Sequence, residues 1–189
     1  MPDEFRIGVD LGGTKIECIL LGSAGGELHR QRVAAPQGVH ERTVHAIRDL
    51  VLETEQTVGQ TCSVGIGIPG TLSKATGLVK NANSTWLIGK PLRTDLEAAL
   101  DRPVRIENDA NCFAISEAVD GAGRDAEVVF GVILGTGVGA GIAINGKPLS
   151  GANAIAGEWG HNPLPWPLDE ERPGGKCYCG REGCIETFL

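Results

Sequence analysis

Gly8-Val-Asp-Leu-Gly-Gly-Thr-Lys-Ile16 and Gly131-Val-Ile-Leu-Gly-Thr-Gly-Val-Gly-Ala-Gly-Ile142 are two versions of one pattern. Each version joins two apolar strands through a short glycine-rich turn, which predicts an antiparallel hairpin. A pattern that occurs twice predicts two related lobes, each of which opens with such a hairpin. Because the backbone N–H groups of glycine turns can bind anions, both hairpins are candidates for holding phosphate.

The segments around the two hairpins predict an α/β fold with a mixed sheet and flanking helices. Apolar runs predict strands at residues 5–10, 16–21, 30–35, 63–68 and 104–106, and helical spacing predicts helices at 40–58, 92–100 and 110–119. We expect a first lobe over residues 1–122 and the start of a second lobe over 123–189. Because far fewer residues follow Val128 than precede it, we expect the second lobe to be incomplete and the chain to be a fragment.

Composition excludes several classes of protein. The chain has 189 residues, of which 41% are hydrophobic and 22% charged, as in a soluble globular protein. Its net charge of −7, without a basic stripe, disfavours nucleic-acid binding. The uncharged run at 128–144 contains five glycines and suits a hairpin better than a membrane helix. Without a visible signal sequence, we expect a cytoplasmic protein in which Cys18, Cys62 and Cys112 are buried thiols.

The first glycine turn follows a carboxylate, Asp10, at the end of the first predicted strand. We expect Asp10 to hold Mg²⁺ through water, because magnesium keeps much of its hydration shell. The candidates for phosphate contacts are the turn residues Gly12, Gly13, Thr14 and Lys15. The spacing matches neither a P-loop nor a dinucleotide-binding fingerprint. The alternative is an ordinary hairpin turn.

Asn108 and Asp109 lie between a predicted strand and a predicted helix. Asp109 is a candidate general base that accepts the proton of an attacking hydroxyl. The alternative is a helix N-cap, for which either residue type is common. A second polar segment, Asn81–Trp86, contains Asn83, whose amide could meet carbohydrate hydroxyls; the alternative there is a solvated turn.

One histidine and three cysteines near the end of the chain have the composition of a structural zinc site. The candidate ligands are His161, Cys177, Cys179 and Cys184. An odd number of cysteines at this spacing argues against disulfides. Glu158 and Glu186 lie beside these ligands but are not needed once four are in place, so we expect them to line a substrate pocket.

Together these motifs resemble the ROK family of sugar kinases, and the resemblance runs through the whole chain. It is carried by Asp10–Lys15, Gly65–Gly70, Glu107–Asn111, Leu134–Gly139, Gly157–His161 and Cys177–Glu186. It implies a duplicated actin-like ATPase fold, also called ribonuclease H-like. It implies that Asp109 is the catalytic base. It further implies that Asn108, Asp109, Glu158, His161 and Glu186 bind sugar hydroxyls, with His161 also on zinc. The resemblance assigns the ATP phosphates to Gly12, Gly13 and Thr14 and to Gly135, Thr136, Gly137 and Gly139.

The activity that the resemblance implies is ATP-dependent phosphorylation of a hexose at its primary hydroxyl. Residues 80–86 and 160–166 are most similar to the fructokinase and mannokinase branch, so fructose is favoured and mannose comes next. N-acetylglucosamine kinase and glucokinase are the alternatives within the family. A sugar sensor without catalysis and a protein-directed ATPase are the alternatives outside it. The implied cofactors are ATP, Mg²⁺ and Zn²⁺, the substrate is a hexose, and a homodimer is expected because the family often forms one.

Overall fold

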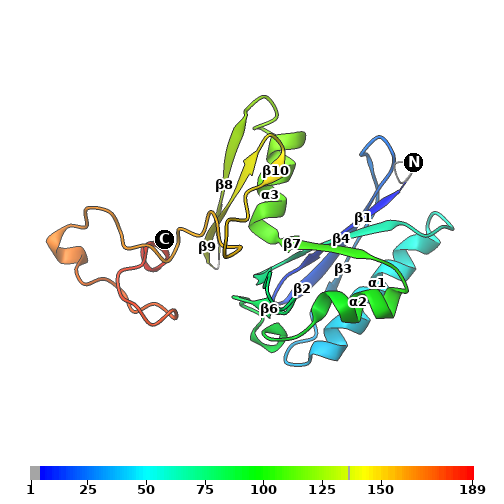
Figure 1. Cartoon of the computed structure of the whole chain (residues 1–189), viewed down its shortest axis with the longest axis horizontal. Coiled ribbons are helices and arrows are strands. Elements are labelled where there is room, and N and C mark those ends of the chain that lie inside the picture. Colours follow the sequence, from blue (N-terminus) through cyan, green and yellow to red (C-terminus); the bar gives the residue numbers. More distant parts are fainter. Residues whose placement is uncertain (1–4, 136) are drawn as a thin grey trace. The chain divides into compact units, whose positions relative to one another are not determined.

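The computed structural model describes residues 5–135 and 137–189 (Figure 1). Its contacts divide the chain into two compact units, Met1–Asp109 and Ala110–Leu189, and each unit is described by itself. Among the described residues, no helix combines the length and the apolar character that crossing a membrane requires.

The first unit is built on a five-stranded mixed sheet with the order β3-β2-β1-β4-β7. Its strands are β1 (Arg6–Leu11), β2 (Lys15–Leu21), β3 (Glu27–Ala34), β4 (Ser63–Ile68) and β7 (Val104–Asn108). The first three strands pair antiparallel, whereas β4 and β7 continue the sheet in parallel from β1. Alternate residues such as Ile7, Val9 and Leu11 are buried, which is the period-two pattern expected of a strand with one covered face.

Two helices, α1 (His40–Gln56) and α2 (Leu92–Leu100), cover the same face of this sheet (Figure 1). Their apolar side chains recur at helical spacing and enter the core, as Ile47 and Leu96 do. The helices are joined by a hydrogen bond of 2.6 Å between His40 Nε2 and Asp95 Oδ2. A short hairpin of β5 (Thr71–Leu72) and β6 (Val79–Lys80), followed by the 3₁₀ turn η1 (Thr85–Leu87), completes the unit.

The second unit contains helix α3 (Asp109–Val119) and a three-stranded antiparallel sheet with the order β10-β9-β8. Its strands are β8 (Val128–Leu134), β9 (Val138–Ile144) and β10 (Lys147–Pro148). The helix lies directly on the sheet, because a Cβ at Gly141 would come within 2.2 Å of the Ala110 carbonyl oxygen. The antiparallel pairing of β8 with β9 confirms the hairpin predicted at 128–144.

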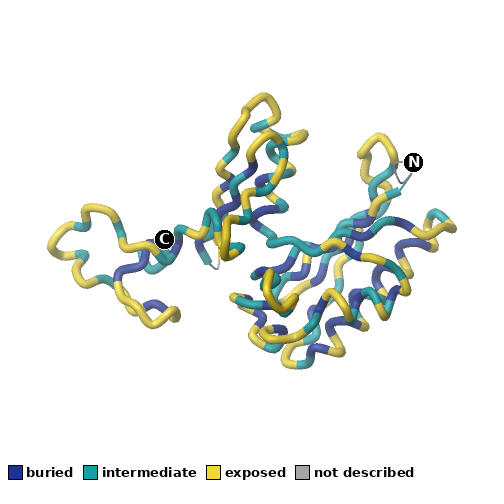
Figure 2. Tube along the Cα trace, in the orientation of Figure 1, coloured by how far each residue is buried: buried dark blue, intermediate teal, exposed yellow. Residues whose placement is uncertain are grey.

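Residues 149–189 contain little regular structure, only the 3₁₀ turns η2 (Asp169–Glu171) and η3 (Ile185–Thr187) and isolated bridges. Most of this segment is exposed (Figure 2). Only three of its hydrophobic residues are buried: Cys177, Cys184 and Ile185. Such a segment has little hydrophobic core of its own, so other interactions must hold its shape.

The strand orders bear on the predicted duplication. β1, β2 and β3 of the first unit correspond in order and direction to β8, β9 and β10 of the second. The predicted end of the first lobe at residue 122 stays a prediction, while the contacts divide the chain after Asp109, the first residue of α3. The reason is that α3 packs on β8 and β9, with Ala114 against Gly131. Cys18 and Cys62 are buried as expected, but Cys112 is only half-buried.

Candidate active site and metal cluster

Asn108 and Asp109 mark the point where β7 ends and α3 begins. The Asn108 side chain donates from Nδ2 to the Gly70 carbonyl oxygen at 3.0 Å and to Asp109 Oδ1 at 3.1 Å. Both residues are half-buried. A carboxylate that is held by an amide N–H in a fixed direction, and is still reached by solvent, can accept a proton from a bound hydroxyl.

Gly70 allows this arrangement through its backbone conformation. Its φ is +134°, and a Cβ would lie 2.8 Å from the Lys80 carbonyl oxygen and 2.9 Å from Ala82 Cα. The segment after β6 therefore lies directly against the residue that holds Asn108. Asn83 belongs to this segment and is exposed, so the structure brings the predicted amide into the neighbourhood of Asn108.

The first glycine turn closes tightly between β1 and β2. Gly12 N–H donates to the Lys15 carbonyl oxygen at 2.9 Å, and Gln37 Nε2 donates to the Gly13 carbonyl oxygen at 3.2 Å. Thr14 and Lys15 are exposed. The predicted phosphate contacts thus lie on a well-anchored turn that solvent can reach.

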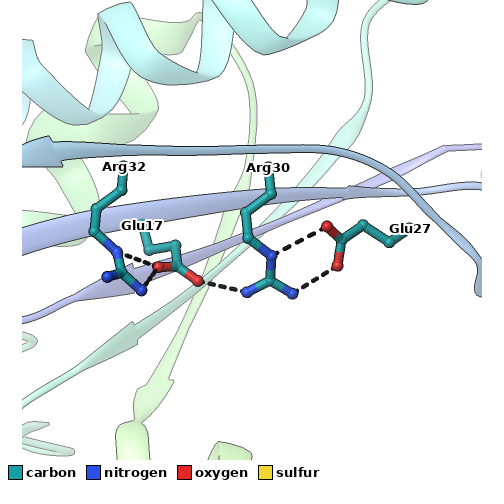
Figure 3. Close-up of polar contacts among 4 residues, drawn as sticks. All are labelled: Glu17, Glu27, Arg30 and Arg32. Carbon is teal, nitrogen blue, oxygen red and sulfur yellow. Dashed lines mark hydrogen bonds and ion pairs between the residues drawn. The ribbon is translucent and has the colours of Figure 1, made fainter.

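Asp10 lies next to a network of ion pairs on the uncovered face of the sheet. Asp10 is paired in register with Glu17 on β2, and Glu17 is paired with Arg32 on β3. Figure 3 shows Glu17 between two arginines: Arg30 Nη1 donates to its Oε1 at 2.5 Å, and Arg32 binds its Oε2. Arg30 also makes a two-pronged contact with Glu27.

The charges around Asp10 act in opposite directions on its protonation. Loss of water around the carboxyl raises the pKa of Asp10, the Glu17 carboxylate raises it further, and Arg32 lowers it. A bound divalent cation would favour the ionised form of this carboxyl group. The surroundings of Asp10 therefore suit a carboxyl group that a cation stabilises as the carboxylate when it binds.

The second glycine turn, between β8 and β9, contacts the C-terminal end of the chain. Gly135 N–H donates to the Gly137 carbonyl oxygen at 3.0 Å, and Val138 N–H donates to Glu186 Oε2 at 2.8 Å. Thr136, which we also predicted to contact phosphate, lies outside the described residues. Glu186, predicted to bind sugar, therefore has one carboxylate oxygen on the backbone of β9.

The loop from Gly157 to His161 rests on the backbone of β9, and its two glycines explain how. A Cβ at Gly157 would lie 2.5 Å from the Ala140 carbonyl oxygen, and one at Gly160 would lie 2.2 Å from that of Val138. Trp159 Nε1 adds a hydrogen bond of 3.1 Å to the Gly139 carbonyl oxygen. Glycines at both positions let Glu158 and His161 stand directly beside the start of β9.

The four candidate zinc ligands lie together in the structure. The ligand atoms are all within 4.8 Å of one another and belong to His161, Cys177, Cys179 and Cys184. The Cys179 and Cys184 sulfurs are 3.7 Å apart, and Cys177 Sγ lies 3.5 Å from His161 Nδ1. In a tetrahedral zinc site, two sulfurs are about 3.8 Å apart, and a sulfur and a nitrogen about 3.5 Å. The donor set and spacing therefore fit Zn²⁺, with His161 using Nδ1.

The thiols of this cluster differ in their protonation. Burial and the neighbouring thiols raise the pKa of Cys184 to about 11. The backbone N–H of Arg181 instead helps to lower the pKa of Cys179, which is exposed. Because zinc binds thiolates, the metal would displace the proton from Cys184.

Tyr178 is a residue of this site that the sequence analysis missed. Its hydroxyl lies 3.1 Å from His161 Nε2, and the two rings meet edge to face. Partial loss of water around the hydroxyl and the neighbouring acidic groups, Glu186 first among them, raise the pKa of Tyr178 to about 12. Its place between two candidate ligands was the available signal, but nothing local showed which way the ring would turn.

The comparisons with known proteins agree on a single family. The model of the ROK family matches residues 6–189. The N-acetyl-D-glucosamine kinase of Pectobacterium carotovorum is 45% identical over 186 residues, which make up 96% of this chain and 61% of that protein. The chain thus spans less than two thirds of the length of the curated relatives that it matches.

Two solved structures have the same fold. A ROK glucokinase from Streptomyces griseus, in complex with glucose and AMPPNP, superposes with a TM-score of 0.82 at 34% identity, covering 98% of this chain and 57% of that one. The ROK hexokinase of Thermus thermophilus gives a TM-score of 0.79 at 34% identity, covering 96% and 59%. The predicted fold class, a mixed α/β fold of the actin-like ATPase type, is confirmed.

Proposed function

Because the chain belongs to the ROK family, we propose that it carries the sugar-binding and phosphate-binding residues of an ATP-dependent sugar kinase. The observation that supports this most is the pair Asn108 and Asp109. The amide of Asn108, anchored on Gly70, aims a half-buried carboxylate at the end of a parallel strand. Sites for ligands in α/β folds commonly lie at this end of the strands.

In the proposed reaction, Asp109 is the general base. It accepts the proton of the primary hydroxyl of the sugar, and the hydroxyl oxygen attacks the γ-phosphorus of ATP. The bond between that phosphorus and the bridging oxygen breaks, and ADP leaves with the electron pair. The Asn108 amide keeps the Asp109 carboxylate in one orientation during this transfer.

The glycine turns are the proposed phosphate contacts of this reaction. The first set consists of Gly12, Gly13, Thr14 and Lys15, and the second set consists of Gly135, Thr136, Gly137 and Gly139. Asp10 would hold Mg²⁺ through water, and the metal would neutralise charge on the phosphates. Zn²⁺ on His161 and the three cysteines would supply structural support to the loop that carries Glu158 and Glu186.

For the substrate we propose N-acetylglucosamine, with glucose as the second candidate. The relatives described above carry N-acetylglucosamine, glucose or hexose in their names, so they support the family alternative and not the fructose that we favoured. In this proposal, Asn83, Asn108, Glu158, His161 and Glu186 contact sugar hydroxyls. A homodimer and a cytoplasmic location stay predictions.

The test is ADP release from Mg-ATP by the complete gene product, over a panel of N-acetylglucosamine, glucose, mannose and fructose. Asp109→Asn keeps the size of the side chain and removes the base, so turnover should fall by about 100-fold or more while sugar affinity, measured by calorimetry, persists. Sugar binding without turnover in the unaltered protein would overturn the kinase and leave a sugar sensor. ATP hydrolysis that no sugar accelerates would instead indicate a protein-directed ATPase.

A further inference from the structure

Tyr178 stands between the candidate metal ligands Cys177 and Cys179, yet its side chain is turned toward the candidate sugar-binding residues. The residue is 75% exposed, so its orientation is not imposed by burial in a core. Its ring meets that of His161 edge to face, with centroids 5.1 Å apart and planes at 82°. Polar contacts must therefore account for where the hydroxyl lies.

The first contact follows from the chemistry of His161. Its Nδ1 faces the sulfur cluster, 3.5 Å from Cys177 Sγ. A metal on Nδ1 leaves the proton on Nε2, which becomes a donor. The Tyr178 hydroxyl oxygen lies 3.1 Å from Nε2 and is placed to accept that hydrogen bond.

The second neighbour of the phenol is Glu186, whose carboxylate helps to raise the pKa of Tyr178. Glu186 Oε2 itself accepts from Val138 N–H at 2.8 Å, at the start of β9. The hydrogen bond that fixes the phenol is therefore the one with His161.

We propose that Tyr178 is a positioning residue, whose hydroxyl holds the His161 ring in the orientation in which Nδ1 faces the metal cluster. Metal-bound histidines usually donate their second N–H to a carboxylate, a carbonyl or water, and the partner fixes the ring. Here the phenol is that partner. The expected effect on sugar affinity rests on the proposed kinase function; the expected effect on the Co²⁺ spectrum does not.

Tyr178→Phe tests the proposal, because it keeps the ring against His161 and removes only the oxygen. The matched control is Trp166→Phe, which alters another aromatic residue of the same segment, 93% exposed and outside the site. Both variants are measured in three ways: the visible spectrum of the Co²⁺-substituted protein, sugar affinity by calorimetry, and the separate kcat and KM values of the complete gene product.

We expect Tyr178→Phe to bind one Co²⁺ per chain with a shifted spectrum, because the His161 ring loses its partner. Loss of an outer partner of a metal ligand typically lowers metal affinity or activity by about 10–100-fold. We therefore expect the affinity for Co²⁺ to fall by about tenfold, and the affinity for sugar to fall with it, because the loop that carries Glu158 is held by the same cluster. The KM for sugar should rise by about the same factor, with the KM for ATP and the melting temperature unchanged. Trp166→Phe should change none of these quantities.

Two results would overturn the proposal. An unchanged Co²⁺ spectrum in Tyr178→Phe would show that the hydroxyl does not orient His161. Equal or tighter sugar binding by the variant would show that the hydroxyl is neutral or competes with the sugar. If the unaltered protein binds no sugar at all, the proposed function fails, and the Co²⁺ spectra still decide whether Tyr178 positions His161.

Discussion

Replacing Gly160 with alanine should displace the loop that carries Glu158 and His161. The new Cβ would lie 2.2 Å from the Val138 carbonyl oxygen, whereas ordinary contact begins at 3.4 Å. Val138 is paired with Leu134 in the β8–β9 hairpin, so the loop has to move rather than the strand. The displacement is roughly 1 Å, the scale of a carbon–oxygen overlap that must be relieved.

A shift of this size has consequences that can be measured separately. Overpacking should lower the free energy of unfolding by about 1–3 kcal/mol. Because His161 follows Gly160 directly, the apparent zinc affinity should fall by about tenfold or more. A 1 Å misplacement of substrate-binding groups should lower kcat/KM for the sugar by about 100-fold.

The assays are urea unfolding, competition for zinc with a chromophoric chelator, and sugar-dependent ADP release. The matched control is Gly26→Ala, because a Cβ there meets nothing within 4 Å. The control should stay within about 0.5 kcal/mol of the unaltered protein and keep its zinc affinity. A Gly160→Ala protein that matches the control in stability and zinc affinity would refute the argument from close approach.

Two further predictions concern charge. Zinc binding should release protons and strengthen as pH rises toward 11, because the raised pKa of Cys184 keeps this thiol neutral and the metal needs the thiolate. Calorimetry in buffers of different ionisation enthalpy would detect the released protons. Zinc binding that does not depend on pH would contradict the prediction. Glu17→Gln should cost about 0–1 kcal/mol at neutral pH, since Arg30 and Arg32 are largely exposed. These arginines lower the pKa of Glu17 below its ordinary 4.5, so the stabilisation is present above that value and is lost in acid. In urea unfolding, the variant and the unaltered protein should therefore reach the same stability in acid. A stability difference that persists in acid would rule out the ion pairs as its cause.

The parts of the fold that were predictable from sequence are those with a local period. Helix α2 matches its predicted range of 92–100, and β4 matches 63–68, because apolar residues recur there at helical or strand spacing. The hairpin of β5 and β6 was missed, since strands of two residues have no period to detect.

The features of the candidate site also differ in whether the local sequence could predict them. The spacing of the cysteines and the glycines is local and indicated a metal cluster and two turns. The contact of Glu186 with Val138 joins residues 48 positions apart and depends on tertiary packing. The pairing of Glu17 with Arg32 depends on the register of β2 and β3, which a one-residue slip would abolish.

The scarcity of buried side chains in residues 149–189 bears on how this protein can diverge. A substitution in a packed core opens a cavity or forces a clash, and therefore restricts its neighbours. In this segment only Cys177, Cys184 and Ile185 are buried hydrophobic residues, so most exposed positions can change without disturbing a hydrophobic core. Its anchors are a few glycines, the His/Cys cluster and the hydrogen bonds of Trp159 and Glu186 to β9, so the rest of the segment can accept new side chains and altered loop lengths while the sheets stay intact. Under the proposed function, evolution toward another sugar would then begin in this part of the chain.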